Sequence, residues 1–127
     1  MVATDRVNEL FADARHMQSE ALKLLEGGDI RDAAEKAWCA TKRATEALVL
    51  ARTGREPEIP AQTSAGLRRM AHEDERFQPL RNHFNACVKE LHVDCFYDGH
   101  CEPEEDVAVT IRNSGPFIDQ AEFLSSG

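Results

Sequence analysis

The sequence lacks any long hydrophobic run, since its longest uninterrupted apolar stretch is residues 47–51. A membrane-spanning helix needs about 20 apolar residues. The opening residues, MVATDRVNEL, also lack the apolar core of a secretory signal. We therefore expect a cytoplasmic protein with no membrane span, in which all four cysteines are reduced.

Positive charge is also scarce. The chain has 15 lysines and arginines against 23 acidic residues, which gives a net charge of −8. This balance argues against a general surface for the phosphates of nucleic acid. Arg68, Arg69, Arg76 and Arg81 form one local basic group, but acidic residues 73–75 interrupt it. Such mixed charge is typical of a solvated helix face.

Several sequence signatures are missing as well. No segment alternates apolar and polar residues as a half-buried strand does, and no pair of segments repeats with a period of about 33–45 residues. A glycine-rich phosphate loop, a G-x-S-x-G elbow and an H-E-x-x-H motif are all absent. With 42% hydrophobic and 30% charged residues, the chain is expected to form one globular domain over residues 1–127.

What the sequence does have is helical periodicity. Apolar residues recur at three- and four-residue steps from Thr4 or Asp5 up to Gly27, and again in an alanine-rich stretch over residues 30–53. Asp29 is suited to cap the second of these helices, and Gly54 to end it. The connection between them is so short that the two helices must pack antiparallel.

The second half of the chain predicts three more helices. Two prolines make residues 55–62 an extended crossover, after which Thr63 or Ser64 begins a short helix. The stretch 80–97 predicts a long helix whose apolar stripe is listed here: Leu80, Phe84, Cys87 or Val88, Leu91 and Cys95. A last helix follows from Glu102, with a kink or a break expected at Pro116. The predicted fold is all-α, an up-and-down left-handed four-helix bundle with an extra short helix.

The stretch from Leu80 to Cys101 concentrates the reactive side chains, with three of the five histidines, three of the four cysteines and the only tyrosine. Its zinc-type ligands are His92, Cys95, His100 and Cys101. Structural zinc sites usually pair two close ligands with two others across a longer loop, whereas these four crowd one helix end. We therefore predict no metal and no cofactor. Cys87 and Cys95 are interpreted as small buried residues of the apolar stripe, since a Cys–His nucleophile needs a thiolate held beside an imidazole.

Two segments carry a resemblance to a known family. One is His92-Val-Asp-Cys-Phe-Tyr97 with Asp98-Gly99 and the acidic start of the last helix; the other is the first helical hairpin, residues 24–38. The chain resembles the small helical HEPN-type proteins, especially the archaeal paREP-like branch. The resemblance implies a bundle that is commonly a homodimer, with a nucleotidyltransferase or an antitoxin as partner. Ribonuclease members carry Arg, then His after four to six residues; Arg81-Asn82 is similar, but positions 86–88 hold no histidine.

Two functions follow from this resemblance. The first is a non-catalytic helical module that binds a partner protein or a nucleotide, with Arg81, His83, His92 and Tyr97 marking the functional face. The second is a metal-independent ribonuclease that uses Arg81 with His83 or His92 as general acid and base. Helical spacing places Arg81 and His92 on one side of the helix but about 16 Å apart, so they could meet at one phosphate only across a dimer. Alternatively, His92 and Tyr97 bond backbone carbonyls and fix the turn into the last helix.

Overall fold

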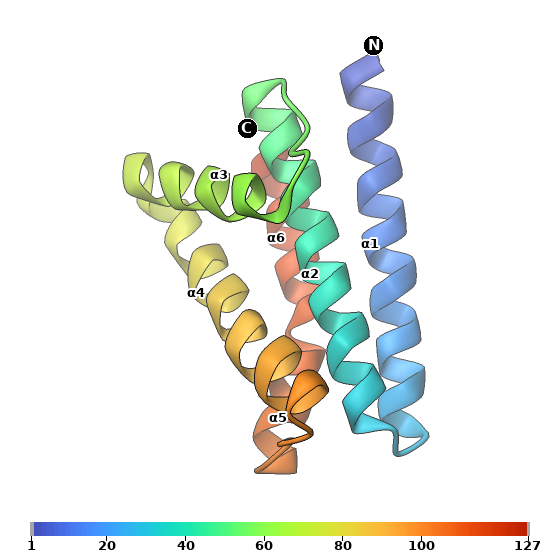
Figure 1. Cartoon of the computed structure of the whole chain (residues 1–127). Helices are drawn as coiled ribbons and strands as arrows, with labels where there is room; N and C mark the ends of the chain where they lie inside the picture. The colour runs from blue at the N-terminus through green and yellow to red at the C-terminus, as the bar shows by residue number, and fades with distance from the viewer. Residues whose placement is uncertain (1, 127) are drawn as a thin grey trace.

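The computed structural model describes residues 2–126, and every regular element in that range is helical (Figure 1). The elements in chain order are α1 (Val2–Glu26), α2 (Ile30–Thr53), α3 (Pro60–Glu73), η1 (Glu75–Phe77), α4 (Gln78–Ala86), η2 (Cys87–Tyr97), α5 (Glu104–Arg112) and α6 (Ser114–Ser125). The all-α prediction is confirmed. Within residues 2–126, no helix is both long enough and apolar enough to cross a membrane.

The first two helices form the predicted antiparallel hairpin, α1 against α2. The side chain of Asp29 accepts a hydrogen bond from the N–H of Asp32 at 3.2 Å, and α2 has the predicted bounds. Helix α1 starts at Val2, slightly before the predicted caps. Six alanines of α2 are fully buried, which lets the neighbouring helices approach closely: Ala33, Ala34, Ala37, Ala40, Ala44 and Ala47.

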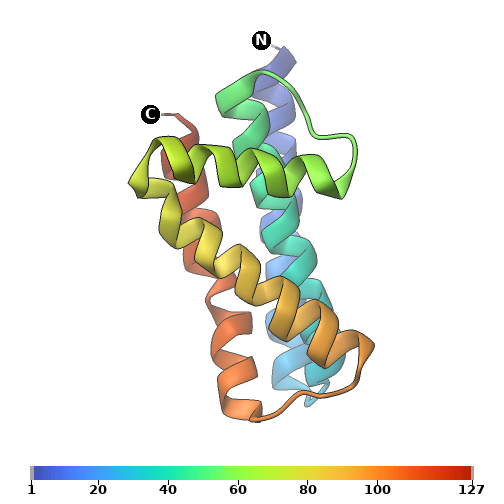
Figure 2. The ribbon, with the colours of Figure 1, turned by 60° about the vertical axis from the view of Figure 1, so that its left-hand side comes forward.

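Helix α3 lies across the bundle and connects α2 to the α4–η2 rod (Figure 2). It begins at Pro60, three residues before the earlier of the two predicted starts, because proline fits the first turn of a helix. The crossover is therefore only residues 54–59. After the short turn η1, helix α4 carries Pro79 in its first turn, where proline is well tolerated.

The long predicted helix 80–97 exists, but its second half is π-helical. From Cys87 to Tyr97 the backbone bonds follow the wide i→i+5 pattern, which the sequence analysis did not predict. The apolar stripe from Leu80 to Cys95 is nevertheless buried, with every member at most 5% exposed. Gly99 ends the rod in the left-handed region at φ 69°, as expected of a helix-terminating glycine.

The last predicted helix is broken in two. Helix α5 ends at Arg112, and α6 starts at Ser114 with Pro116 in its first turn. Proline has no N–H for the carbonyl of Arg112, so the helix breaks within the turn that precedes Pro116.

Arg15 of α1 holds α6 through ion pairs with Asp119 at 2.9 Å and Glu122 at 2.5 Å.

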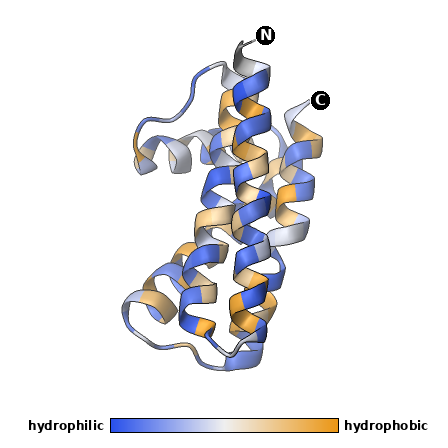
Figure 3. Cartoon of the chain, turned by 90° about the vertical axis from the view of Figure 1, so that its right-hand side faces the viewer, coloured by the Kyte–Doolittle hydropathy of each residue, from blue (hydrophilic) through white to orange (hydrophobic). Residues whose placement is uncertain are grey.

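Most of the large apolar residues of α6 are buried. Phe117 and Leu124 are only 4% and 2% exposed. Both face the core because α6 packs on α2. Phe123 alone is exposed, at 71%. Hydrophilic and hydrophobic residues alternate along the helices, as amphipathic packing requires (Figure 3).

Candidate functional site

His92 lies where η2 packs on α2. Its Nδ1–H donates a hydrogen bond to Glu35 Oε1 at 2.8 Å, and both side chains are about a quarter exposed, at 28% and 25%. The imidazole also lies against the indole of Trp38, with ring centroids 5.6 Å apart. Because Nδ1 is used by Glu35, Nε2 is the ring nitrogen left for another contact.

Tyr97 continues this aromatic group towards solvent. Its ring meets His92 edge-on at 5.1 Å, and its side chain is 66% exposed. The guanidinium of Arg31 donates to the carbonyls of Phe96 at 2.6 Å and Tyr97 at 3.2 Å. A cation suits the negative end of a helix, so Arg31 is the residue that fixes the end of η2. We had raised this carbonyl-bonding role as an alternative for His92 and Tyr97, and no sequence pattern pointed to Arg31.

His83 lies away from this group, between helices α2, α4 and α6. Its Nε2 is 3.2 Å from the thiol of Cys87 and 3.5 Å from the hydroxyl of Thr41, and its ring stacks on Phe117 at 5.0 Å. Burial lowers the pKa of His83 from 6.5 to about 4. The imidazole is therefore neutral at neutral pH.

Cys87 is the partner that a nucleophilic Cys–His pair would need. It is fully buried, and burial raises the pKa of its thiol from 9.0 to about 12. A reactive cysteine requires the opposite shift, towards the thiolate. The contact between Cys87 and His83 is thus one between neutral groups of the core.

Arg81 is half-buried on α4, in the rod that also carries His83, His92 and Tyr97. Among residues 2–126, no hydrogen bond or ion pair joins it to any of these three. The α-helical spacing used to place Arg81 and His92 on one side does not apply from Cys87 onward, because each π-type turn takes about one residue more than an α-turn.

The cysteines correct another prediction. Cys95 and Cys101 form a disulfide with Cα atoms 4.3 Å apart, while Cys39 and Cys87 are free. We had expected four thiols from the predicted compartment, but the link between compartment and disulfide bonds is only a statistical tendency. The turn after η2 brings the two sulfurs together. The bond uses two of the four zinc-type ligands, and within the described residues no three His, Cys, Asp or Glu side chains are grouped to hold a metal ion.

Comparison with known protein families identifies the family of this chain. Residues 9–111 match the model of the archaeal PaREP1/PaREP8 family. The chain belongs to this family. No curated protein and no solved structure matches it. The PaREP1/PaREP8 match contains Arg81, His83, His92 and Tyr97 and ends before α6.

This PaREP1/PaREP8 chain also has a cavity that sequence reasoning missed. About 330 Å³ in volume, it lies between α2, α3 and the α4–η2 rod and is lined by His92 together with Trp38, Lys42 and Thr63. We had expected Thr63 or Ser64 to begin the short helix. Because α3 begins at Pro60, Thr63 is instead a buried residue of its first turns. The preference of proline for the first helical position was the signal that could have revealed this.

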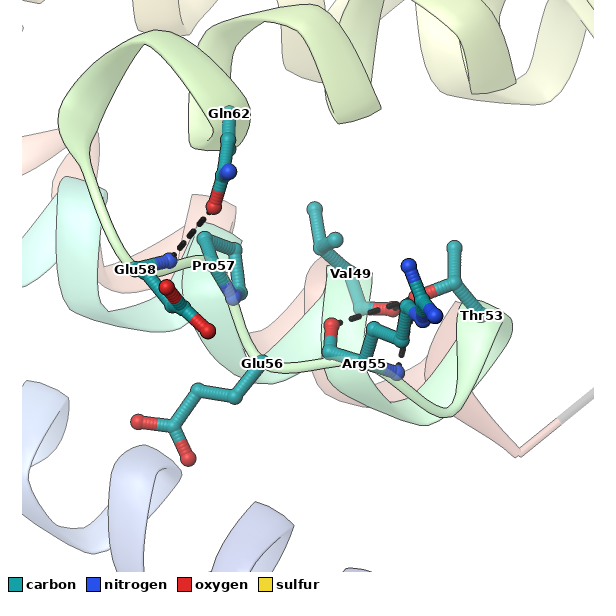
Figure 4. Close-up of a pocket in the computed structure, with 7 residues that line it drawn as sticks. All are labelled: Val49, Thr53, Arg55, Glu56, Pro57, Glu58 and Gln62. Atoms are coloured by element: carbon teal, nitrogen blue, oxygen red, sulfur yellow. Dashed lines mark hydrogen bonds between the residues drawn. The ribbon is translucent and has the colours of Figure 1, made fainter.

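A larger hollow, of about 940 Å³, lies beside the crossover loop (Figure 4). Gln62 Oε1 accepts from the N–H of Glu58 at 2.7 Å, and the hydroxyl of Thr53 donates to the carbonyl of Val49 at 2.7 Å. Glu56 is paired with Arg6 of α1 at 2.8 Å. These contacts within the chain hold the loop between α2 and α3.

Proposed function

We propose that the protein is a non-catalytic helical module of HEPN type, with the left-handed up-and-down arrangement of such bundles. It binds a partner protein or a nucleotide and works as a homodimer. The observation that carries the proposal is the state of the candidate acid–base groups. His92 is bonded to Glu35, His83 is a neutral core group, and neither is joined to Arg81.

The charge of the chain supports the same proposal. A ribonuclease that works without a metal needs an acid, a base and a cation gathered at one phosphate. Here the net charge is −8, and the basic residue of the expected motif, Arg81, lies before the π-helical segment while His92 lies within it. The arrangement favours binding over phosphodiester cleavage.

The partner surface that we propose is the exposed end of η2. Tyr97 presents most of its ring to solvent, and Val93 on the same element is 38% exposed. Exposed aromatic residues next to a polar rim are typical of protein interfaces. We propose a nucleotidyltransferase or an antitoxin as the partner, as the HEPN-type resemblance implies.

The wild-type protein is expected not to cleave labelled single-stranded RNA. The variant His92→Ala should also show no cleavage, and its free energy of unfolding should fall by about 1–3 kcal/mol because the carboxylate of Glu35 loses its hydrogen-bond donor. Gel analysis of the RNA and urea unfolding of the same samples measure both effects.

His72→Ala is the matched control for this experiment, since His72 is an exposed histidine on α3. It should leave both the RNA and the stability unchanged. Cleavage by the wild type that is lost in a still-folded His92→Ala variant, and kept in His72→Ala, would refute the non-catalytic proposal and favour the ribonuclease.

The homodimer is expected to sediment at twice the 14.2 kDa chain mass at micromolar concentration. Because Phe123 is the exposed aromatic residue of α6, Phe123→Ser should shift the species towards the monomer. Val109→Ser, at a 53% exposed apolar position of α5, serves as the control and should remain dimeric. A wild-type sample with only the 14.2 kDa species would contradict the dimer.

A further inference from the structure

The cavity between α2, α3 and the α4–η2 rod has an apolar wall built from aromatic side chains. Trp38 and Phe84 meet edge-to-face, with ring centroids 5.1 Å apart, and Val88 extends the wall. Both aromatic residues are core residues, at 9% and 5% exposed, so the wall is held rigidly. The volume of the cavity, about 330 Å³, is near the lower end for ligand pockets and suits a ligand with a single ring.

Thr63 lies in the cavity wall, with its hydroxyl buried behind it. The residue lines the cavity and is 1% exposed, and its Oγ1 is the only buried side-chain oxygen or nitrogen within the described residues that has no hydrogen-bond partner. Native proteins pair nearly all such groups, since an unpaired buried hydroxyl is destabilising. Because this oxygen has almost no accessible surface, it is not a contact for a ligand in the cavity.

Lys42 adds a positive charge to the same cavity. It is half-buried on α2, and no ion pair or hydrogen bond joins its ammonium group to any residue in 2–126. The chain as a whole has a net charge of −8. Lys89 of the neighbouring rod, in contrast, is paired with Asp94 at 2.8 Å. Glu35 is bonded to His92, which also lines the cavity.

The start of α3 completes the polar side. Pro60, Ala61 and Ser64 line the cavity, and α3 starts at Pro60, after the residue Ile59, with no side-chain cap and no acidic residue in its first turn. The positive ends of helices attract anions. This end lies beside the same cavity as Lys42.

We propose that this cavity binds a small organic oxyanion, a carboxylate or a phosphate monoester carried on a single flat ring. The ring packs on Trp38 and Phe84, and the anionic oxygens accept from Lys42. His92 also lines the cavity. The inference deepens the proposed function, because it names a ligand class for the binding module.

Trp38 makes the proposal directly measurable, since it is the only tryptophan of the chain. Phenyl phosphate and benzoate are titrated into the full-length protein, followed by Trp38 fluorescence and by calorimetry. At least one of them should give saturable binding with a Kd of about 0.1–1 mM, a range typical of ligands of this size. Benzyl alcohol and inorganic phosphate, which lack the charge and the ring respectively, should bind at least tenfold more weakly.

Two variants test the polar side. Lys42→Met keeps the length of the side chain but removes its charge, and should weaken binding of the better anion about tenfold or more. Thr63→Val removes a hydroxyl that does not face the cavity, so it should bind as the wild type does and leave the free protein as stable as the wild type or more stable. Lys23→Met, an exposed lysine of α1 outside the cavity, is the matched control and should bind as the wild type does.

Three results would overturn the inference. They are no saturable signal with either anion up to about 10 mM, equal binding of benzyl alcohol, and unchanged binding by Lys42→Met. Preference for phenyl phosphate over benzoate, or the reverse, identifies the oxyanion and supports the proposal either way. The test uses neither RNA nor a partner protein, so it can fail while the non-catalytic proposal stands, and RNA cleavage would refute that proposal without affecting this one.

Discussion

Replacing Phe77 by alanine is expected to lower the free energy of unfolding by about 3–5 kcal/mol. Phe77 lies in η1, at the corner where the chain turns from α3 into α4, and it is only 1% exposed. The guanidinium of Arg52 lies over its ring at 5.4 Å, which adds a cation–π contact between α2 and this corner. Truncation removes the ring from the core and leaves a cavity that the surrounding helices cannot fill.

Urea unfolding followed by circular dichroism measures this effect. Ile59→Ala is the control, since Ile59 is a large apolar residue but 56% exposed, and it should change the stability by less than about 0.5 kcal/mol. Phe77→Leu should fall between the two because it keeps most of the apolar volume. Equal stability of Phe77→Ala and Ile59→Ala would contradict the packing of this corner.

Acidification from pH 6.5 to pH 4 is expected to remove about 3 kcal/mol of stability through His83 alone. Burial lowers the pKa of His83 from 6.5 in the unfolded chain to about 4 in the folded protein. Between these values the unfolded chain binds a proton that the folded protein does not, so stability falls as the pH falls. The contribution is complete above pH 6.5 and is lost once the pH has fallen through about 4.

The measurement is the free energy of unfolding across this pH range for the wild type and for His83→Gln. Glutamine retains a polar group near Cys87 and Thr41 but does not titrate, so the variant should show a flatter curve whatever its absolute stability. His16→Gln, at a side chain that is 76% exposed, should keep the wild-type slope. Parallel curves for the wild type and His83→Gln would rule out a buried neutral imidazole.

Helix boundaries were predictable where local chemistry decides them. The bounds of α2 follow from Asp29 at one end and Gly54, with φ 77°, at the other, and both signals act over a few residues. Pro116 likewise predicted an interruption of the last helix, and the structure has one between Arg112 and Ser114. Burial of the stripe from Leu80 to Cys95 followed from periodicity, because one face of a bundle helix must pack on its neighbours.

Features that depend on contacts between distant segments were not predictable in this way. His92 meets Glu35 across 57 positions, and His83 meets Thr41 across 42. The π-helical turns from Cys87 onward are a second case. They leave the apolar stripe buried against α2, yet nothing in the local sequence distinguishes them from α-turns.

The sequence by itself determined the all-α class, several helix ends and the buried stripe, because capping, proline geometry and apolar periodicity are local properties. The tertiary structure alone decided which side chains share a site. In the folded chain, Cys95 and Cys101 form a disulfide and His83 lies in the core. Lys42 of α2 and Thr63 of α3 line the same cavity. These juxtapositions depend on how the helices cross, and helix crossing is set by the packing of the whole core.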